Sequence, residues 1–139
     1  MHVAIRNGYH HNWIVDNLPS AAIGITRYGT QKIRYGGGFP VGFILMDYDM
    51  PYVYNHVNIH ISYQKVEMGY RIVEFAVEPL SISHKVRQDY EWKKDLKQDF
   101  AKSLDTCSRS KHLSRDQISN SQVLKLGESI LYTYDVIWK

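Results

Sequence analysis

The 139-residue sequence has little of several features that define particular classes of protein. It holds a single cysteine, Cys107, so the chain cannot build a disulfide framework of its own. No run approaches the roughly 20 apolar residues of a membrane helix, and the longest candidate, residues 39–46, is interrupted by Pro40 and Gly42. The first residues lack the apolar core of a signal peptide, and no Asn-x-Ser/Thr sequon occurs. Taken by themselves, these absences predict a cytosolic, unanchored chain.

Net charge is also scarce, because 17 Lys and Arg face 14 Asp and Glu. The resulting +3 is small for a dedicated nucleic-acid binder, so we expect no nucleic-acid partner. One basic concentration lies in the second half of the chain, and it comprises Lys93, Lys94, Lys97, Lys102, Arg109, Lys111 and Arg115. Acidic residues interleave with it, which is typical of a solvated surface rather than a phosphate-binding one.

Aromatic residues, in contrast, are plentiful: 11 Tyr, 3 Trp and 4 Phe. Such a content excludes wholesale disorder. With 44% apolar residues and a length typical of one domain, we expect residues 1–139 to form a single folded unit.

Period-two alternation gives the clearest structural signal, over residues 52–63. One set of alternating positions is apolar: Val53, Val57, Ile59, Ile61 and Tyr63. The other set is polar or aromatic: Tyr54, His56, Asn58, His60 and Ser62. Alternate residues of a strand face opposite sides, so this pattern predicts a strand with one apolar face, which Asn55 interrupts near its start.

Further strands are predicted on both sides of this one. Residues 70–77 form a hairpin with it through Gly69, and Pro79 is expected to end that second strand. Shorter apolar runs lie at residues 13–15, 31–35, 39–46 and 130–138, and the glycines of residues 36–38 form a turn. Many short strands separated by Gly, Pro and Asn indicate an all-β fold, a β-sandwich or jelly-roll-like domain.

A charged and Ser-rich insertion, residues 85–129, precedes the last strand. Apolar residues spaced near four within 85–104 predict an amphipathic helix, and a solvated, partly disordered insertion is the alternative. Residues 103–121 carry no apolar periodicity and are read as a loop.

No constellation in the sequence predicts catalysis, a cofactor or a metal. His56 and His60 lie about 13 Å apart on one strand face, too far to share an ion. The acidic residues that could form a hydrolytic pair, Asp47, Asp49, Glu74 and Glu78, have no spacing that demands it, and Asp47 and Asp49 look like a turn. Residues 36–38 lack the Gly-Lys-Ser/Thr ending of a phosphate loop. We therefore assign no catalytic, cofactor-binding or metal residue and expect a protein that is not an enzyme.

Five segments taken in order do carry a resemblance. They are residues 11–19 (HNWIVDNLP), 38–43 (GFPVGF), 54–59 (YNHVNI), 70–81 (YRIVEFAVEPLS) and 132–138 (YTYDVIW). Their order and spacing resemble the N-terminal luminal domain of the transmembrane 9 superfamily, the nonaspanins. Residues 85–129 fall where that family has variable loops.

The resemblance implies a fragment of a multispanning protein of the Golgi and endosomes, acting in trafficking or sorting of membrane proteins. Its implied partners are membrane-protein cargo and the membrane-spanning part missing from this chain. It also implies that Cys107 pairs with a cysteine outside this chain, in the oxidising lumen.

We take the strand face of Tyr54, His56, Asn58 and His60 as a candidate contact surface. The alternative for these side chains is that they face water or another sheet. A different function also stays open, a free-standing β-sandwich that binds carbohydrate through exposed Tyr and Trp. The least favoured hypothesis is a hydrolase using a carboxylate pair.

Overall fold

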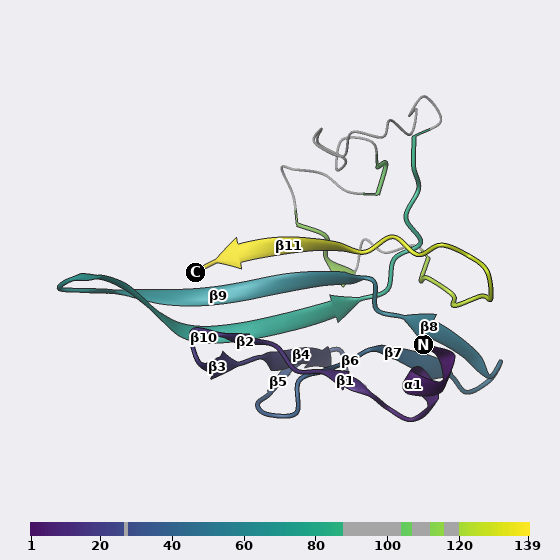
Figure 1. Ribbon diagram of the computed structural model, residues 1–139, viewed down its shortest axis with the longest axis horizontal. Helices are drawn as coiled ribbons and strands as arrows, with labels where there is room; N and C mark the ends of the chain where they lie inside the picture. The colour runs from purple at the N-terminus through teal and green to yellow at the C-terminus, as the bar shows by residue number, and fades with distance from the viewer. Residues whose placement is uncertain (27, 88–103, 107–111, 116–119) are drawn as a thin grey trace.

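A computed structural model describes residues 1–26, 28–87, 104–106, 112–115 and 120–139, which form β-strands with one short helix (Figure 1). The helix is α1 (His2–Arg6). The strands are β1 (His10–His11), β2 (Ile14–Val15), β3 (Leu18–Pro19), β4 (Ala21–Ile25), β5 (Gln31–Arg34), β6 (Phe39–Pro40), β7 (Gly42–Leu45), β8 (Met50–Val53), β9 (His56–Val66), β10 (Gly69–Leu80) and β11 (Thr133–Trp138). The predicted all-β fold is confirmed, and these strands form several open sheets rather than a closed barrel.

The main sheet has five strands in the order β11-β9-β10-β4-β5. β9 and β10 form a long antiparallel hairpin whose two-residue loop, Glu67–Met68, follows from the pairing of Val66 with Gly69. In Figure 1 this hairpin extends well beyond the other strands. β11 joins β9 in parallel and β4 joins β10 in parallel, so the sheet is mixed.

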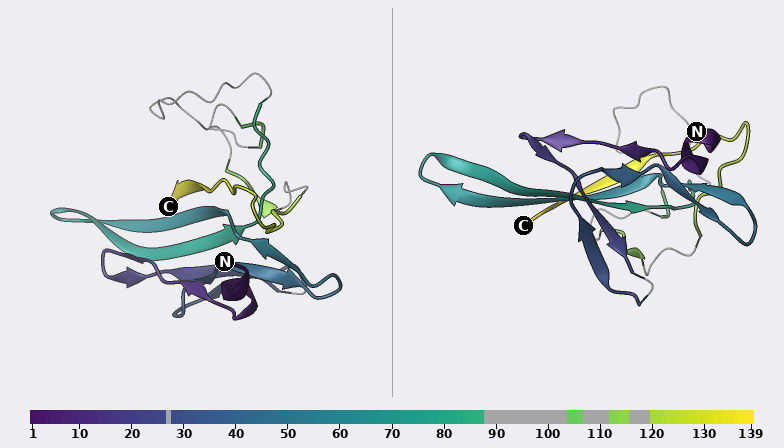
Figure 2. Two further views of the ribbon diagram at one scale, coloured as in Figure 1. Left: turned by 45° about the vertical axis from the view of Figure 1, so that its right-hand side comes forward. Right: turned by 90° about the horizontal axis from the view of Figure 1, so that it is seen from below.

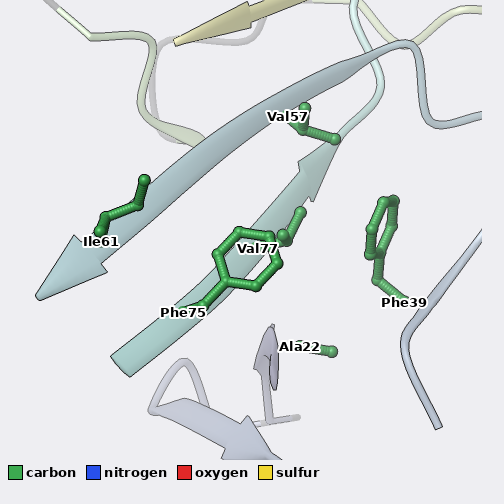
Figure 3. Close-up of a cluster of buried hydrophobic side chains, with 6 residues drawn as sticks. All are labelled: Ala22, Phe39, Val57, Ile61, Phe75 and Val77. Atoms are coloured by element: carbon green, nitrogen blue, oxygen red, sulfur yellow. The ribbon is translucent and has the colours of Figure 1, made fainter. Parts of the chain in front are cut away.

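Three two-stranded sheets accompany the main one: β1-β6, β2-β3 and β7-β8. The pairs β1-β6 and β2-β3 lie below β9 and β10 in Figure 1, and the left view of Figure 2 agrees. The hydrophobic core fills the space between the layers (Figure 3). It comprises Ala22, Phe39, Val57, Ile61, Phe75 and Val77, with Val15, Leu18, Ile59, Ile72 and Val136 packed against it.

The apolar face of β9 is therefore the face that packs against the core, as its alternation predicts. The register places Phe75 beside Ile61 and Val77 beside Ile59, so β10 contributes to the same face. Phe39 is nearly fully buried and meets Trp13 edge to face, with ring centroids 4.9 Å apart. Aromatic pairs of this kind add stabilisation beyond the area they bury.

Two turns depend on residues that accept positive φ. Asp16 and Asn17, at φ 49° and 62°, close the β2–β3 hairpin, and Asx residues tolerate this region better than most. Residues 36–38 have positive φ throughout, which confirms the predicted glycine turn. A Cβ on Gly38 would collide with the His11 carbonyl, so the close approach of β1 also requires glycine there.

Several strand predictions need correction. The predicted strand 52–63 is two strands, because the chain turns at Tyr54 and Asn55 between β8 and β9. Likewise, residues 39–46 divide into β6 and β7. Pro79 does not end the second strand: it pairs with Val57, and β10 continues to Leu80. The register of β4 stops at Val77, so Pro79 lies beyond that neighbour, where a missing N–H is tolerated.

The insertion is only partly described. The predicted helix over 85–104 lies mostly outside the described residues, and at its two ends Val86 and Leu104 form an antiparallel bridge instead. Most of the predicted loop 103–121, with Cys107, also lies outside them. Within the described ranges, no helix has both the length and the apolar character needed to cross a membrane.

Candidate functional site

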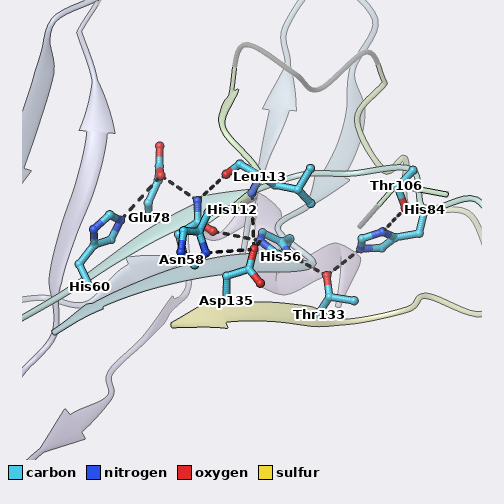
Figure 4. A network of polar contacts seen from close by, with 10 residues as sticks. All are labelled: His56, Asn58, His60, Glu78, His84, Thr106, His112, Leu113, Thr133 and Asp135. Carbon is cyan, nitrogen blue, oxygen red and sulfur yellow. Dashed lines mark hydrogen bonds and ion pairs between the residues drawn. The ribbon is translucent and has the colours of Figure 1, made fainter. Parts of the chain in front are cut away.

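The outer face of the main sheet, opposite the core, carries a network of polar side chains (Figure 4). The register brings together His56, Asn58 and His60 of β9, Glu78 of β10, and Thr133 and Asp135 of β11. Because paired residues of neighbouring strands face the same side, the alternation that sends Val57 to the core sends these six outward.

Two segments, formed by parts of the insertion and by the adjoining His84, pack on this outer face. The first, which we call the arm, consists of residues 84–87 and 104–106, joined by the Val86–Leu104 bridge and an Arg87–Asp105 ion pair at 3.1 Å. The second, the return segment, is residues 112–115. Leu113 accepts a hydrogen bond from Asn58 Nδ2 at 2.7 Å through its carbonyl, and Arg115 Nη2 donates to the Pro79 carbonyl at 3.4 Å. The sheet and the insertion are thus held together by polar contacts.

A continuous chain of hydrogen bonds, the Thr–His chain, links the arm to β11 and β9. It runs from Thr106 Oγ1 to His84 Nδ1 at 2.8 Å, and from His84 Nε2 to Thr133 Oγ1 at 2.8 Å. It continues from Thr133 Oγ1 to His56 Nδ1 at 2.6 Å and from His56 Nε2 to Asn58 Oδ1 at 3.2 Å. His56 and Asn58 are almost fully buried, so these bonds replace hydration that both side chains lose.

The direction of each bond follows from Asn58. Its Nδ2 donates to Leu113 and to Glu78, so Oδ1 faces His56 and accepts from Nε2–H. A neutral imidazole has one donor and one acceptor nitrogen, so His56 Nδ1 accepts from the Thr133 hydroxyl. By the same rule, Thr133 accepts from His84 Nε2–H, and His84 Nδ1 accepts from the Thr106 hydroxyl. When both rings are neutral, all four bonds point the same way along the chain.

Two carboxylates lie beside this chain. Asp135 Oδ2 is 3.6 Å from His56 Nε2 and 3.8 Å from His112 Nδ1, and it accepts from the Leu113 amide. Glu78 Oε2 accepts from Asn58 at 3.1 Å and is 4.0 Å from His60 Nε2. The His60 ring, and after it the Asn58 amide, lower the pKa of Glu78 against the effect of burial.

Burial raises the pKa of a carboxyl group such as Glu78, but it lowers the pKa of the two histidines in the Thr–His chain. It lowers the pKa of His56, although Asn58, Asp135 and Glu78 favour its charged form. Burial and the nearby His56 ring lower the pKa of His84 to about 4. Both rings are therefore neutral at pH 7, as the directed chain requires.

Asn55 supports the same region from the corner between β8 and β9. It is almost fully buried, its Nδ2 donates to the Ile82 and Leu131 carbonyls at 2.8 and 3.0 Å, and its Oδ1 accepts from the Ile82 amide at 2.8 Å. Three segments distant in sequence therefore meet at one amide. This explains why a polar residue interrupts the apolar alternation.

The predicted contact surface of Tyr54, His56, Asn58 and His60 is wrong as an exposed surface. His56 and Asn58 are 1% and 2% exposed because the insertion folds back over them. Tyr54 lies outside β9 and packs on Phe43, with ring centroids 5.3 Å apart. The contact between the return segment and β9 joins residues far apart in sequence, so alternation along one strand does not predict it.

The carboxylates considered for hydrolysis are not brought together as a pair. Asp49 lies in the turn between β7 and β8, where it binds Arg6, and Asp47 lies in the same turn. Glu74 accepts from Ser62, and Glu78 belongs to the outer-face network. Among the described residues, no group of three or more His, Cys, Asp or Glu is placed to share a metal ion.

Sequence reasoning missed an exposed group of rings, which we call the aromatic cluster: Tyr63, Tyr70 and Trp138. Tyr63 meets Tyr70 and Trp138 edge to face at 5.5 and 6.2 Å between centroids. The side chains come from β9, β10 and β11 and are 44%, 71% and 61% exposed. The apolar alternation could have revealed this cluster. Tyr63 and Trp138 continue the core-facing positions of β9 and β11, but they lie beyond the core residues that the second layer covers.

Comparisons with known proteins agree with this chain's motifs. The model of the family "Endomembrane protein 70" matches residues 1–139. The chain is 31% identical over 111 residues to transmembrane 9 superfamily member 1 of Saccharomyces cerevisiae, a match over 56% of the chain and 16% of that protein. It is 34% identical to the human member 2 over 95 residues, covering 55% of the chain and 14% of the relative. It is 27% identical to member 10 of Arabidopsis thaliana, covering 95% and 20%.

No solved structure is similar to the chain at a significant level. The matches span only a small fraction of each relative, whereas the family model spans the chain from end to end. The predicted resemblance to the nonaspanins is therefore confirmed, and the chain belongs to the endomembrane protein 70, or transmembrane 9, family.

Proposed function

We propose that this chain is a non-catalytic binding domain on the luminal side of Golgi and endosomal membranes, where it takes part in sorting membrane-protein cargo. The family match over residues 1–139 carries this proposal, since the family is described as endomembrane and its curated members as transmembrane. The proposed partners are the cargo and a membrane-spanning part of the same protein.

The aromatic cluster is the surface we propose for contact with cargo. Tyr and Trp are enriched where proteins bind one another, because their rings give a large contact area at a low cost in conformational entropy. The edge-to-face contacts hold Tyr63 between Tyr70 and Trp138, on three adjacent strands of one sheet. The cluster therefore offers a fixed rather than an adaptable surface.

Replacement of two exposed rings tests this role. We expect Tyr70→Ser with Trp138→Ser, made in the full-length protein, to fail to restore the surface abundance of membrane proteins in cells that lack it. Quantitative proteomics of the cell surface measures this. The fold should survive, because both side chains are more than half exposed.

The matched control is Tyr28→Ser, since Tyr28 is 94% exposed at the β4–β5 hairpin, away from the cluster. It should restore surface abundance as the wild type does. Full restoration by the double variant would overturn the role of the cluster.

The same exposed rings favour a second candidate, carbohydrate binding by stacking on Tyr70 and Trp138. In that case the purified chain binds immobilised glycans, and the double variant loses this binding while Tyr28→Ser keeps it. Glycan binding combined with normal cargo sorting by the double variant would favour this second function.

A further inference from the structure

We propose that the Thr–His chain is a proton-operated clasp, which holds the arm and the return segment on the outer face while its histidines are neutral and releases them when they take up protons. The clasp is a property of the folded chain and stands whether or not the domain sorts cargo.

The first support is connectivity. The chain begins at Thr106 on the arm, crosses Thr133 of β11 and ends at Asn58 of β9, which also binds Leu113 of the return segment (Figure 4). Both parts of the insertion are therefore attached to the sheet through one series of bonds. A change at one ring affects the other, because the Thr133 hydroxyl lies between the two rings and has a single proton to donate.

The second support is the cost of placing a proton on a buried ring, since His56 is 1% exposed and its hydrogen bonds are arranged for the neutral form. If His56 gains one, Nδ1–H points at the Thr133 hydroxyl, which must give up its own bond to that nitrogen. Thr133 then either turns its hydrogen away from both rings or donates to His84, in which case His84 donates to Thr106 and three of the four bonds reverse. A second proton places two cationic rings with centroids 6.4 Å apart in a largely buried site.

Among the described residues, titratable and charged neighbours on each packed element affect whether His56 and His84 are neutral or charged. Asp135 of β11 and Glu78 of β10 favour a charged His56, whereas the His56 ring opposes a charged His84. His112 of the return segment lies beside Asp135, and His60 of β9 and Arg115 lie near Glu78. On the arm, Asp105 is paired with Arg87.

The direction and size of the effect follow from linkage. A released His84 has an ordinary pKa near 6.5, whereas the clasped ring has a pKa of about 4, so release takes up a proton between those values. Between pH 7.5 and 5, the equilibrium constant for release should rise about 30-fold for His84 alone. His56, whose pKa is also lowered, adds to this.

Hydrogen exchange of the whole chain, followed by NMR and scaled to the intrinsic rate at each pH, measures the release. We expect the protection of the Leu113 amide, which donates to Asp135 of the sheet, to fall about 30-fold from pH 7.5 to 5, while Phe75 and Val77 in β10 keep theirs. In His84→Gln the amide nitrogen can still donate to Thr133 but cannot be protonated, so most of the pH dependence should disappear. His10→Gln, an exposed histidine of β1, should respond as the wild type does.

Constant protection of the Leu113 amide across this pH range would overturn the clasp, as would an unchanged response in His84→Gln. If that variant does not fold, the imidazole resonances of the wild type decide instead. Titration of His56 and His84 below pH 6.5, together with release, supports the clasp. Titration of both rings at or above 6.5 contradicts it.

Discussion

A single polar residue fixes the two segments that flank the insertion, residues 85–129. Asn55 makes three buried hydrogen bonds to the backbone of Ile82 and Leu131, where no regular strand pairing occurs. The side-chain amide replaces the backbone hydrogen bonds of a short β-ladder, because it donates and accepts at the same time. Neither an apolar residue nor a carboxylate can do both.

Asn55→Asp should therefore destabilise the chain by about 3 kcal/mol or more, since it removes two donated bonds and sets a carboxylate against two buried carbonyls. Urea unfolding followed by tryptophan fluorescence measures this free energy. The matched change Asn12→Asp, at an exposed position, should stay within about 0.5 kcal/mol of the wild type. Equal stability of the two variants would show that the Asn55 bonds contribute little.

At this scale the sequence predicted which residues alternate but not what they face. His56, Asn58 and His60 alternate with core residues and were read as a contact surface, yet they contact Thr133, Leu113 and Glu78. Those partners lie 18 to 77 positions away along the chain. A polar strand face has the same pattern whether water or another part of the chain covers it, so only the three-dimensional structure separates the two.

At the scale of elements, strand existence was predictable where side chains alternate strongly. β9, β10, β5 and β11 were all expected, because β-branched and aromatic residues mark them. β4 was missed, although it is central in the sheet, because Ala21, Ala22 and Gly24 carry little strand signal. Small residues are found where neighbouring layers approach closely, and Ala22 belongs to the core.

Two strand glycines differ sharply in what surrounds them, and this gives a prediction for β7. A Cβ on Gly42 would collide with the Tyr52 carbonyl and the Ile5 side chain, so Gly42→Ala should destabilise by about 2–3 kcal/mol. Gly24 in β4 has free space and an ordinary φ, so Gly24→Ala should be neutral or stabilise by about 0.5–1 kcal/mol. Thermal unfolding followed by circular dichroism compares them. If Gly42→Ala were as stable as Gly24→Ala, Ile5 of α1 and Tyr52 of β8 would have to move aside at little cost, contrary to this prediction.

For the whole molecule, the two faces of the main sheet are covered by different chemistry. The apolar face packs on the small sheets of the N-terminal part, whereas the polar face is covered by the chain's own insertion. The first layer follows from hydrophobic patterning, and the family resemblance came from the same strand and turn segments. The insertion's contact with the polar face depends on single hydrogen bonds, which cannot be predicted from a charged and Ser-rich sequence.

This division predicts how global stability depends on pH. His56 and His84 have lowered pKa values in the folded chain, so the unfolded chain binds more protons below about pH 6.5, and the free energy of unfolding falls from there toward pH 4. Glu78 also has a lowered pKa, so its contribution is complete above about pH 4.5 and is lost as the pH falls through its folded pKa. Both effects have the same sign, in two successive windows.

Urea unfolding at pH values from 7.5 to 3.5 separates the two windows. His84→Gln should flatten the curve between pH 6.5 and 4, by at most about 1.4 kcal/mol per pH unit and by less to the extent that the ring is open to solvent. Glu78→Gln should flatten it only below pH 4.5, and Glu128→Gln, at an exposed ion pair with Lys125, should leave it unchanged. An upper window that persists in His84→Gln would show that the acid response comes from other groups. Loss of the upper window in His84→Gln, with the lower window intact, would show that the buried histidines and Glu78 respond to acid independently.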